Sequence, residues 1–191
     1  LPTPEPVRTR IPLNATLPTV PAERVPEVLA KYEGEIQELK IKVAEKVQSL
    51  TDDIARVAAA RDALPNARLK VDANMGYTLG GALDALRKLC EYGIIYAEQP
   101  VASIEDMAAL RFAIAKERLP ARIAADESIR KAEDPLKVAR ANAADLMVIK
   151  AAPLGGVRRA LALVEQAQLP AVVSSALESS VGIGVGASLA A

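Results

Sequence analysis

The chain of 191 residues contains no histidine, no tryptophan and a single phenylalanine, and only 3% of its residues are aromatic. Without histidine, neither a Ser-His-Asp triad nor a Cys-His pair can form, and no metal site can use an imidazole ligand. Whatever chemistry the protein performs must therefore use lysine, carboxylate or hydroxyl groups.

Charge and hydropathy argue against two classes of partner. Lys+Arg and Asp+Glu both number 24, so no net charge attracts nucleic acid or an anionic membrane, and few aromatic rings are available for base stacking. No apolar stretch reaches the roughly 20 residues that a helix needs to span a bilayer. We therefore expect no nucleic-acid partner and no membrane partner.

Cysteine is nearly absent too. Cys90 is the only one, so no intrachain disulfide can form, which fits a reducing compartment such as the cytoplasm. The residue falls late in a predicted helix, and no histidine exists to activate its thiol. We expect a packing role for Cys90.

Short apolar runs recur at intervals of 24 to 30 residues, and each ends at a polar or charged residue. One such interval holds a strand and a helix, so the pattern predicts parallel strands alternating with helices, as in a (β/α)8-type TIM barrel. The residues at the C-terminal strand ends of such a barrel face one mouth. The series is opened by Asn14 in RIPLNATL and continues with Lys42, Asp72, Glu98, Asp126, Lys150 and Ser175.

Seven strands are predicted, whereas a closed barrel has eight, so we expect a partial barrel that lacks its last strand. The Pro-rich segment 1–10 is predicted to be a connector from a preceding domain, and 11–191 the barrel domain. An open, doubly wound sheet is the alternative. Its phosphate signature G-x-G-x-x-G does not follow the first strand, and the near-match at 182–186 lies at the far end.

Four helix starts can be predicted from capping chemistry. Pro21 is expected to open a helix that ends at Gly34, and Thr51, Thr78 and Ser103 precede three further helical patterns.

Three carboxylates end consecutive predicted strands, namely Asp72, Glu98 and Asp126. Side by side at the mouth, with no His or Cys nearby, they present hard oxygen ligands. This pattern favours Mg²⁺, with Mn²⁺ as a substitute. The ordinary alternative is a set of solvated acids at the starts of loops.

Three lysines complete the pattern. Lys40 and Lys42 are two apart on one strand, so both point to the same face, and their apolar neighbours argue against an exposed edge strand. Lys150 ends the sixth strand, across the barrel. Because nearby cations lower the pKa of a lysine, such a lysine can abstract a proton. An enzyme using a lysine base with Mg²⁺ is the resulting expectation.

At these residues the sequence resembles a known family. K-x-K, VDAN, AEQP, ADES and VIK, in this order, resemble the muconate-lactonizing subgroup of the enolase superfamily, from about residue 11 to the end. Within the subgroup, RIPLNATL, IAADESIR, KAAPLGG and VVSSALESSVG are most similar to the o-succinylbenzoate synthases of menaquinone biosynthesis. The resemblance implies a (β/α)7β barrel preceded by an N-terminal α+β capping domain that this chain lacks.

The resemblance also implies a role for each site residue. Lys42 would be the base, Lys40 would tune the field around it, and Lys150 would face the intermediate from the opposite side. The remaining roles are magnesium ligation by Asp72, Glu98 and Asp126, and substrate binding or support of the site by Asn14, Asn74, Ser174, Ser175 and Glu127.

The implied reaction is the dehydration of 2-succinyl-6-hydroxy-2,4-cyclohexadiene-1-carboxylate to 2-succinylbenzoate, a hydro-lyase reaction on a small-molecule carboxylate. One alternative is an N-acylamino acid racemase or dipeptide epimerase of the same subgroup, in which two lysines work on one α-carbon. A second alternative is a non-catalytic barrel scaffold. The resemblance also suggests self-association into a homo-oligomer.

Overall fold

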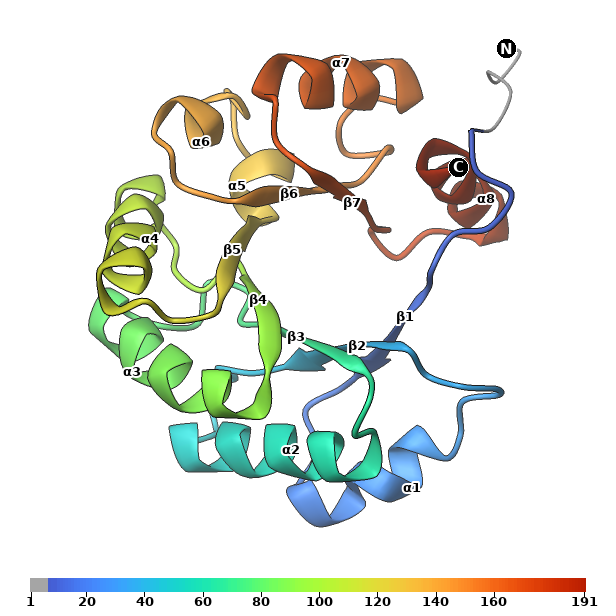
Figure 1. Ribbon diagram of the computed structural model, residues 1–191. Coiled ribbons are helices and arrows are strands. Elements are labelled where there is room, and N and C mark those ends of the chain that lie inside the picture. Colours follow the sequence, from blue (N-terminus) through green and yellow to red (C-terminus); the bar gives the residue numbers. More distant parts are fainter. Residues whose placement is uncertain (1–6) are drawn as a thin grey trace.

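The computed structural model of the protein describes residues 7–191. A single sheet of seven parallel strands follows the chain order β1 to β7 and curls into an incomplete barrel, with the helices around its outside (Figure 1). The strands are β1 (Asn14–Leu17), β2 (Glu38–Lys42), β3 (Arg68–Asp72), β4 (Ile94–Glu98), β5 (Arg122–Ala125), β6 (Leu146–Ile149) and β7 (Ala171–Val173).

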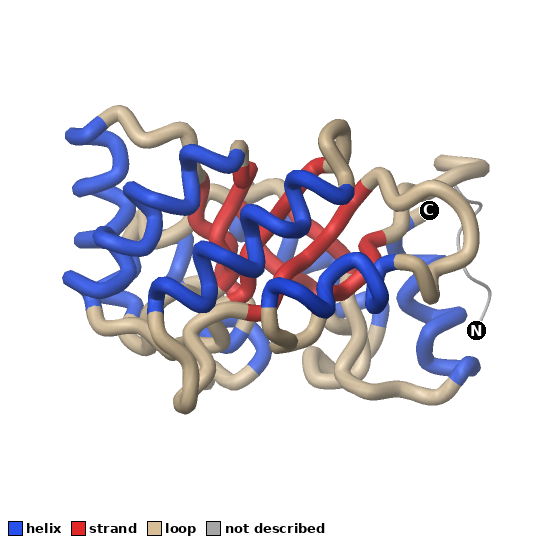
Figure 2. Tube along the Cα trace, turned by 90° about the horizontal axis from the view of Figure 1, so that it is seen from below, coloured by secondary structure: helices blue, strands red, loops and turns tan. Residues whose placement is uncertain are grey.

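Helices follow the strands and cover the outer face of the sheet, and Figure 2 shows them flanking the strands along the side of the molecule. The strictly sequential strand order and the one-sided helix layer confirm the predicted partial barrel and exclude a doubly wound sheet. The helices are η1 (Ala22–Arg24), α1 (Val25–Leu29), α2 (Leu50–Ala63), α3 (Leu79–Leu89), η2 (Cys90–Tyr92), α4 (Ile104–Glu117), α5 (Glu127–Arg130), α6 (Lys137–Arg140), α7 (Val157–Ala167) and α8 (Ser180–Ala190).

Alternation along each strand decides which side chains enter the barrel. On β2, Leu39 and Ile41 are fully buried among the apolar residues that join the sheet to the helices. The residues that alternate with them, Lys40 and Lys42, therefore point into the barrel. A second, smaller apolar cluster is formed by Tyr96, Ala124, Leu146 and Val148, and most of its members line the barrel interior.

Two of the predicted helix starts are confirmed. The hydroxyls of Thr78 and Ser103 accept hydrogen bonds from backbone amides three residues later. The predicted start at Thr51 is wrong by two residues, because Ser49 is the N-cap, forms a reciprocal capping box with Asp52, and α2 begins at residue 50. The helix after Pro21 is shorter than predicted, since α1 ends at residue 29 rather than at Gly34.

The two edge strands, β1 and β7, are not paired with each other. The segment before β1 and helix α8 lie beside this opening, where the backbone amide of Arg8 donates to the carbonyl of Ala191 at 2.7 Å. Of the predicted connector, residues 1–6 lie outside the described residues, and 7–10 form no helix or strand. Across residues 7–191, no helix has both the length and the apolar character needed to cross a membrane.

Candidate active site

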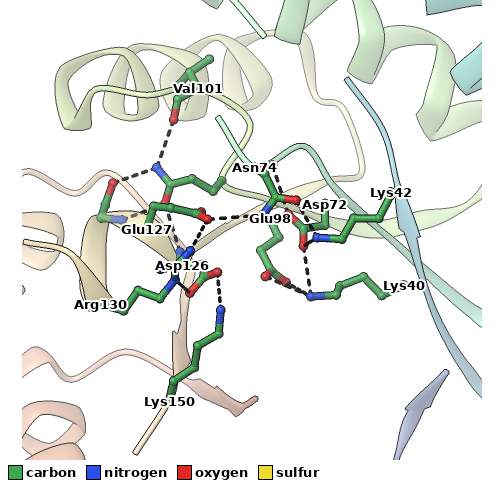
Figure 3. A network of polar contacts seen from close by, with 12 residues as sticks. Lys40, Lys42, Asp72, Asn74, Glu98, Val101, Asp126, Glu127, Arg130 and Lys150 are labelled. Carbon is green, nitrogen blue, oxygen red and sulfur yellow. Dashed lines mark hydrogen bonds and ion pairs between the residues drawn. The ribbon is translucent and has the colours of Figure 1, made fainter. Parts of the chain in front are cut away.

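The C-terminal ends of five strands bring charged side chains to one mouth of the barrel. Lys42 pairs in register with Asp72, and Asp72 with Glu98, so these three lie on one line across β2, β3 and β4. Asp126 and Lys150 come directly after the last residues of β5 and β6. The predicted convergence of these strand ends is therefore confirmed, and Figure 3 shows their side chains facing one another.

Each carboxylate lies against at least one lysine amine. Nζ of Lys42 lies 2.7 Å from Oδ2 of Asp72, and Nζ of Lys40 lies 3.1 Å from the same oxygen. Lys40 also donates to Glu98 at 3.2 Å. On the other side, Lys150 donates to Oδ2 of Asp126 at 2.6 Å. The two opposed lysines, 42 and 150, are thus bound to different carboxylates of the same cluster.

Polar side chains connect the two halves of the cluster. Lys42 donates to Oδ1 of Asn74 at 2.5 Å, and the amide nitrogen of Asn74 donates to Glu127 at 3.3 Å. Arg130 then donates to the same Glu127 oxygen at 2.7 Å, and its Nε lies 3.2 Å from Oδ1 of Asp126. Asn74 and Glu127 thus both lie within this network (Figure 3), and the roles expected of them, support of the metal by Asn74 and orientation of neighbours by Glu127, stay predictions.

Burial and neighbouring charge shift the pKa values of these groups in opposite directions. Burial raises the pKa of Glu98 to about 7, Asp72 and Asp126 add to the rise, and Lys40 opposes it. Burial would also raise the pKa of Asp72, but Lys40 and Lys42 outweigh it and hold that pKa below its ordinary value. Asp72 is therefore an anion at neutral pH, whereas Glu98 is close to its titration point.

The pKa of Lys40 moves against expectation. Burial would lower it, but the carboxylates of Glu98 and Asp72 are close enough to outweigh burial and raise it. The raised pKa of Lys40 has a simple cause, because its nearest charged neighbours in this arrangement are anions.

The carboxylates at the mouth are paired with lysines rather than with one another. Within residues 7–191, no group of three acidic or cysteine side chains is arranged to hold a metal ion. The donors nevertheless fit a hard cation: Asp72, Glu98 and Asp126 are each 1% exposed and offer only oxygen. In addition, Oε2 of Glu127 is buried without a hydrogen-bond donor, and Oδ1 of Asp126 has the ion pair to Arg130 but no hydrogen bond.

Gln99 holds this end of the sheet, and its importance was not predicted from the sequence. Its buried side chain accepts hydrogen bonds from the backbone amides of Asp126 at 3.0 Å and Ser128 at 3.1 Å, and donates to the Ser128 hydroxyl at 2.8 Å. Its position in the sequence could have indicated this role, because Gln99 directly follows the predicted site residue Glu98 in the AEQP motif. Arg130 was missed as well, although it stands one helical turn after Asp126.

The backbone after β2, β3 and β4 adopts an uncommon conformation. Four non-glycine residues there have positive φ: Ala44 (62°), Asn74 (43°), Met75 (69°) and Gln99 (38°). Such angles cost L-residues about 1–2 kcal/mol each. They turn the chain sharply, and Asn74 returns toward the cluster.

Asn14 does not lie at the mouth. It begins β1 rather than ending it, and it pairs with Glu38. Glu38 lies two residues before Lys40 on β2, toward the opposite end of the barrel. There the Asn14 side chain accepts a hydrogen bond from Lys70 at 2.6 Å, and Lys70 also pairs with Glu38. The prediction that Asn14 opens the series of strand-end residues is therefore wrong, because the polar residue stands at the start of the apolar run.

Ser174 and Ser175 follow β7 and line a cavity of about 1400 Å³, together with Lys40 and Glu98. The backbone amide of Ser174 is bound to the carbonyl of Ile149, which fixes the start of this segment beside β6. Asn14, Glu38 and Lys70 line the same cavity, whereas Lys42, Asp72, Asp126 and Lys150 do not. The substrate contacts expected of the two serines therefore stay a prediction.

Comparison with known sequences identifies the family to which this chain is similar. The family described as "Enolase C-terminal domain-like" matches residues 22–191, nearly the whole of the described barrel. The chain belongs to this family. Proteins named o-succinylbenzoate synthase are similar to this enolase C-terminal domain-like chain, with 55% identity in Mycolicibacterium smegmatis and 47% in Thermobifida fusca. The two alignments cover 97% and 98% of this chain.

Solved structures agree with the family. Muconate cycloisomerase from Pseudomonas fluorescens superposes with a TM-score of 0.83 at 28% identity, covering 98% of this chain and 52% of that one. A dipeptide epimerase from Enterococcus faecalis gives 0.77 at 29% identity, covering 92% and 51%. The chain spans 56% and 57% of the length of the two synthases, so it corresponds to about half of each relative.

Proposed function

We propose that the protein is an o-succinylbenzoate synthase, which dehydrates 2-succinyl-6-hydroxy-2,4-cyclohexadiene-1-carboxylate to 2-succinylbenzoate. The observation that supports this most directly is the placement of two lysines on opposite sides of three buried carboxylates. Relatives at 47–55% identity carry that name, and the motifs of the site run through the aligned region. Menaquinone biosynthesis is the pathway that this activity would serve.

In the proposed reaction Lys42 acts as the base. With its amine uncharged, Nζ takes the proton from the carbon that bears the carboxylate, and the electron pair of that C–H bond moves into the carboxylate group. The pair then returns to form the new ring double bond as the C–O bond to the ring hydroxyl breaks. The hydroxide takes the proton back from Lys42 and leaves as water, and the ring becomes aromatic. One group thus serves first as base and then as acid.

The proposed metal ion is Mg²⁺, held by Asp72, Glu98 and Asp126. When bound, a divalent cation supplies positive charge that stabilises the developing dianion of the substrate carboxylate. Lys40 and Lys150 add positive charge from either side, and Asn74 and Glu127 keep the neighbouring side chains in place. Ser174 and Ser175 are proposed contacts for the succinyl end, since they line the same cavity as Lys40 and Glu98.

The two lysines are held alike and do not separate the synthase from a racemase. Nζ of Lys42 lies 2.7 Å from Asp72, and Nζ of Lys150 lies 2.6 Å from Asp126. A dehydration needs one base, while racemisation needs both lysines to reach the same carbon from opposite faces. Racemisation or epimerisation is the second candidate, because a dipeptide epimerase shares the fold.

The test follows diene absorbance with and without Mg²⁺ in the wild-type protein, in Lys42→Ala and in Lys46→Ala. Lys46 is an exposed lysine in the loop after β2 and serves as the matched control. We expect Mg²⁺-dependent loss of absorbance that Lys42→Ala abolishes and Lys46→Ala retains. Turnover that survives in Lys42→Ala would contradict the assignment of the base.

Metal binding is tested separately from activity. Isothermal titration with Mg²⁺ and electron paramagnetic resonance with Mn²⁺ should each detect one site, and Asp126→Asn should weaken it. A folded protein that binds Mg²⁺ but leaves the diene unchanged would refute the synthase. Deuterium exchange at the α-carbon of an N-acyl amino acid would then favour the racemase.

A further inference from the structure

Helix α2 places two charged residues on the face that packs against the sheet. Asp53 is 1% exposed and Arg56 is fully buried, in a stripe that otherwise consists of Val57 and Ala60. A buried ion pair of this kind adds little stability over a well-packed apolar pair. The charges therefore call for an explanation other than packing, and their partners supply it.

Arg56 binds backbone on two different segments. Its Nε donates to the carbonyl of Val20 at 2.7 Å, and its Nη1 donates to the carbonyl of Lys42 at 3.0 Å and to Asp53 at 2.9 Å. Lys42 is the last residue of β2, so the guanidinium holds the strand at the point from which the proposed base extends.

Asp53 holds the next part of the same turn. One of its oxygens accepts hydrogen bonds from the backbone amide of Ala44 at 2.8 Å and from the hydroxyl of Tyr77 at 2.8 Å. Ala44 has a φ of 62°. The carbonyl of Lys42 and the amide of Ala44 are thus bound to the two members of one ion pair, which fixes the chain on both sides of Val43.

The loop after β3 closes the other side of this turn. A Cβ at Gly76 would lie 2.4 Å from the carbonyl oxygen of Ala44 and 2.7 Å from its Cβ, so only glycine allows this approach. Tyr77 follows at once and reaches Asp53. The turn after Lys42 therefore has an ion pair on one side and a tightly packed backbone on the other.

We propose that Asp53, Arg56 and Tyr77 are positioning residues that set where the amine of Lys42 lies relative to Asp72 and Asn74. They touch neither substrate nor reacting atoms and act only through the backbone of residues 42–44. This inference rests on the proposed function, in which Lys42 is the base. Displacement of a base by a fraction of an ångström lowers the rate of proton transfer while leaving binding nearly unchanged.

The test compares Tyr77→Phe with Tyr32→Phe. Both remove one hydroxyl, but that of Tyr32 binds the backbone of Thr16 and does not contact the turn. We expect kcat to fall about ten-fold in Tyr77→Phe, with KM and the Mg²⁺ dissociation constant within about two-fold of wild type. The isotope effect with substrate deuterated at the α-carbon should rise, because proton transfer becomes slower. In Tyr32→Phe all four quantities should stay at their wild-type values.

A second measurement does not depend on turnover. Amide hydrogen exchange of the peptide covering residues 42–48 should become faster in Tyr77→Phe and stay unchanged in Tyr32→Phe. Arg56→Lys keeps the charge but cannot reach all three acceptors at once, so it should give the same pattern more strongly. Faster exchange in a protein that turns over no diene would refute the proposed function and leave the positioning of residues 42–44 intact.

Two results would overturn the inference. The first is unchanged exchange in residues 42–48 in both Tyr77→Phe and Arg56→Lys. The second is a fall in kcat accompanied by an equal rise in KM and in the metal dissociation constant, which would indicate general loosening of the site. A fall in kcat of the same size in Tyr32→Phe would count against it in the same way.

Discussion

Replacing Gln99 with leucine would test how the β5 end of the site is held. The amide of Gln99 is fully buried and joins β4 to the turn that carries Asp126. Leucine has nearly the same size but can neither accept nor donate a hydrogen bond. The positive φ at this position affects both side chains equally, so backbone strain cancels in the comparison.

The expected loss follows from the hydrogen bonds. Without the amide oxygen, the backbone N–H groups of Asp126 and Ser128 lose their side-chain acceptor in a site that water does not reach. Each buried donor without a partner costs about 2 kcal/mol. Burial of the more apolar leucine side chain stabilises the folded protein by about 1 kcal/mol, which offsets part of this loss. The free energy of unfolding should therefore fall by about 3 kcal/mol.

Urea unfolding followed by circular dichroism measures this loss. With a denaturant slope of about 2 kcal/mol per molar urea, the midpoint should fall by about 1.5 M. Gln37→Leu, the same chemical change at an exposed glutamine, is the control and should leave the midpoint nearly unchanged. A loss below about 1 kcal/mol in Gln99→Leu, or one equal to that of the control, would refute the reasoning.

Three further outcomes are expected. Gly76→Ala should lower the melting temperature by about 4–8 °C, because its Cβ would overlap Ala44, whereas Gly80→Ala, with open space around the new Cβ, should not lower it. Asn74→Leu removes the acceptor of the proposed base and should slow dehydration about ten-fold; an unchanged initial rate would count against its role. Burial raises the pKa of Cys90, so at pH 8.5 its thiolate fraction is reduced and iodoacetamide should alkylate it more slowly than in the urea-unfolded chain. Equal rates in both states would contradict this.

Much of the fold could be predicted because the end of each strand is marked in the sequence by a polar residue after an apolar run, a pattern that does not depend on tertiary contacts. Asp72, Glu98 and Asp126 each close an apolar run, and in parallel strands that position alone determines which end of the barrel a side chain reaches. Asn14 shows the limit of the method. Its apolar neighbours lie on both sides, so the sequence did not distinguish the start of the strand from its end.

The contacts within the site were less predictable, because they depend on which charges come closest. The sequence placed lysines and carboxylates at one mouth, but Lys40 lies near enough to Glu98 for attraction to outweigh burial. Gln99 and Arg56 were missed for a related reason. Both are polar residues whose partners lie far away in sequence or on the backbone, and no spacing rule indicates such partners.

The positive φ angles after β2, β3 and β4 have a consequence for engineering the protein. The backbone at the mouth is strained at four residues, Ala44, Asn74, Met75 and Gln99. This end of the barrel therefore holds conformations that serve the proposed site rather than stability. Glycine at Ala44 would relax the chain and raise thermal tolerance while freeing the turn beside Lys42. Efforts to make the protein more heat-resistant should therefore change the outer helices and the opposite rim, and leave these four positions alone.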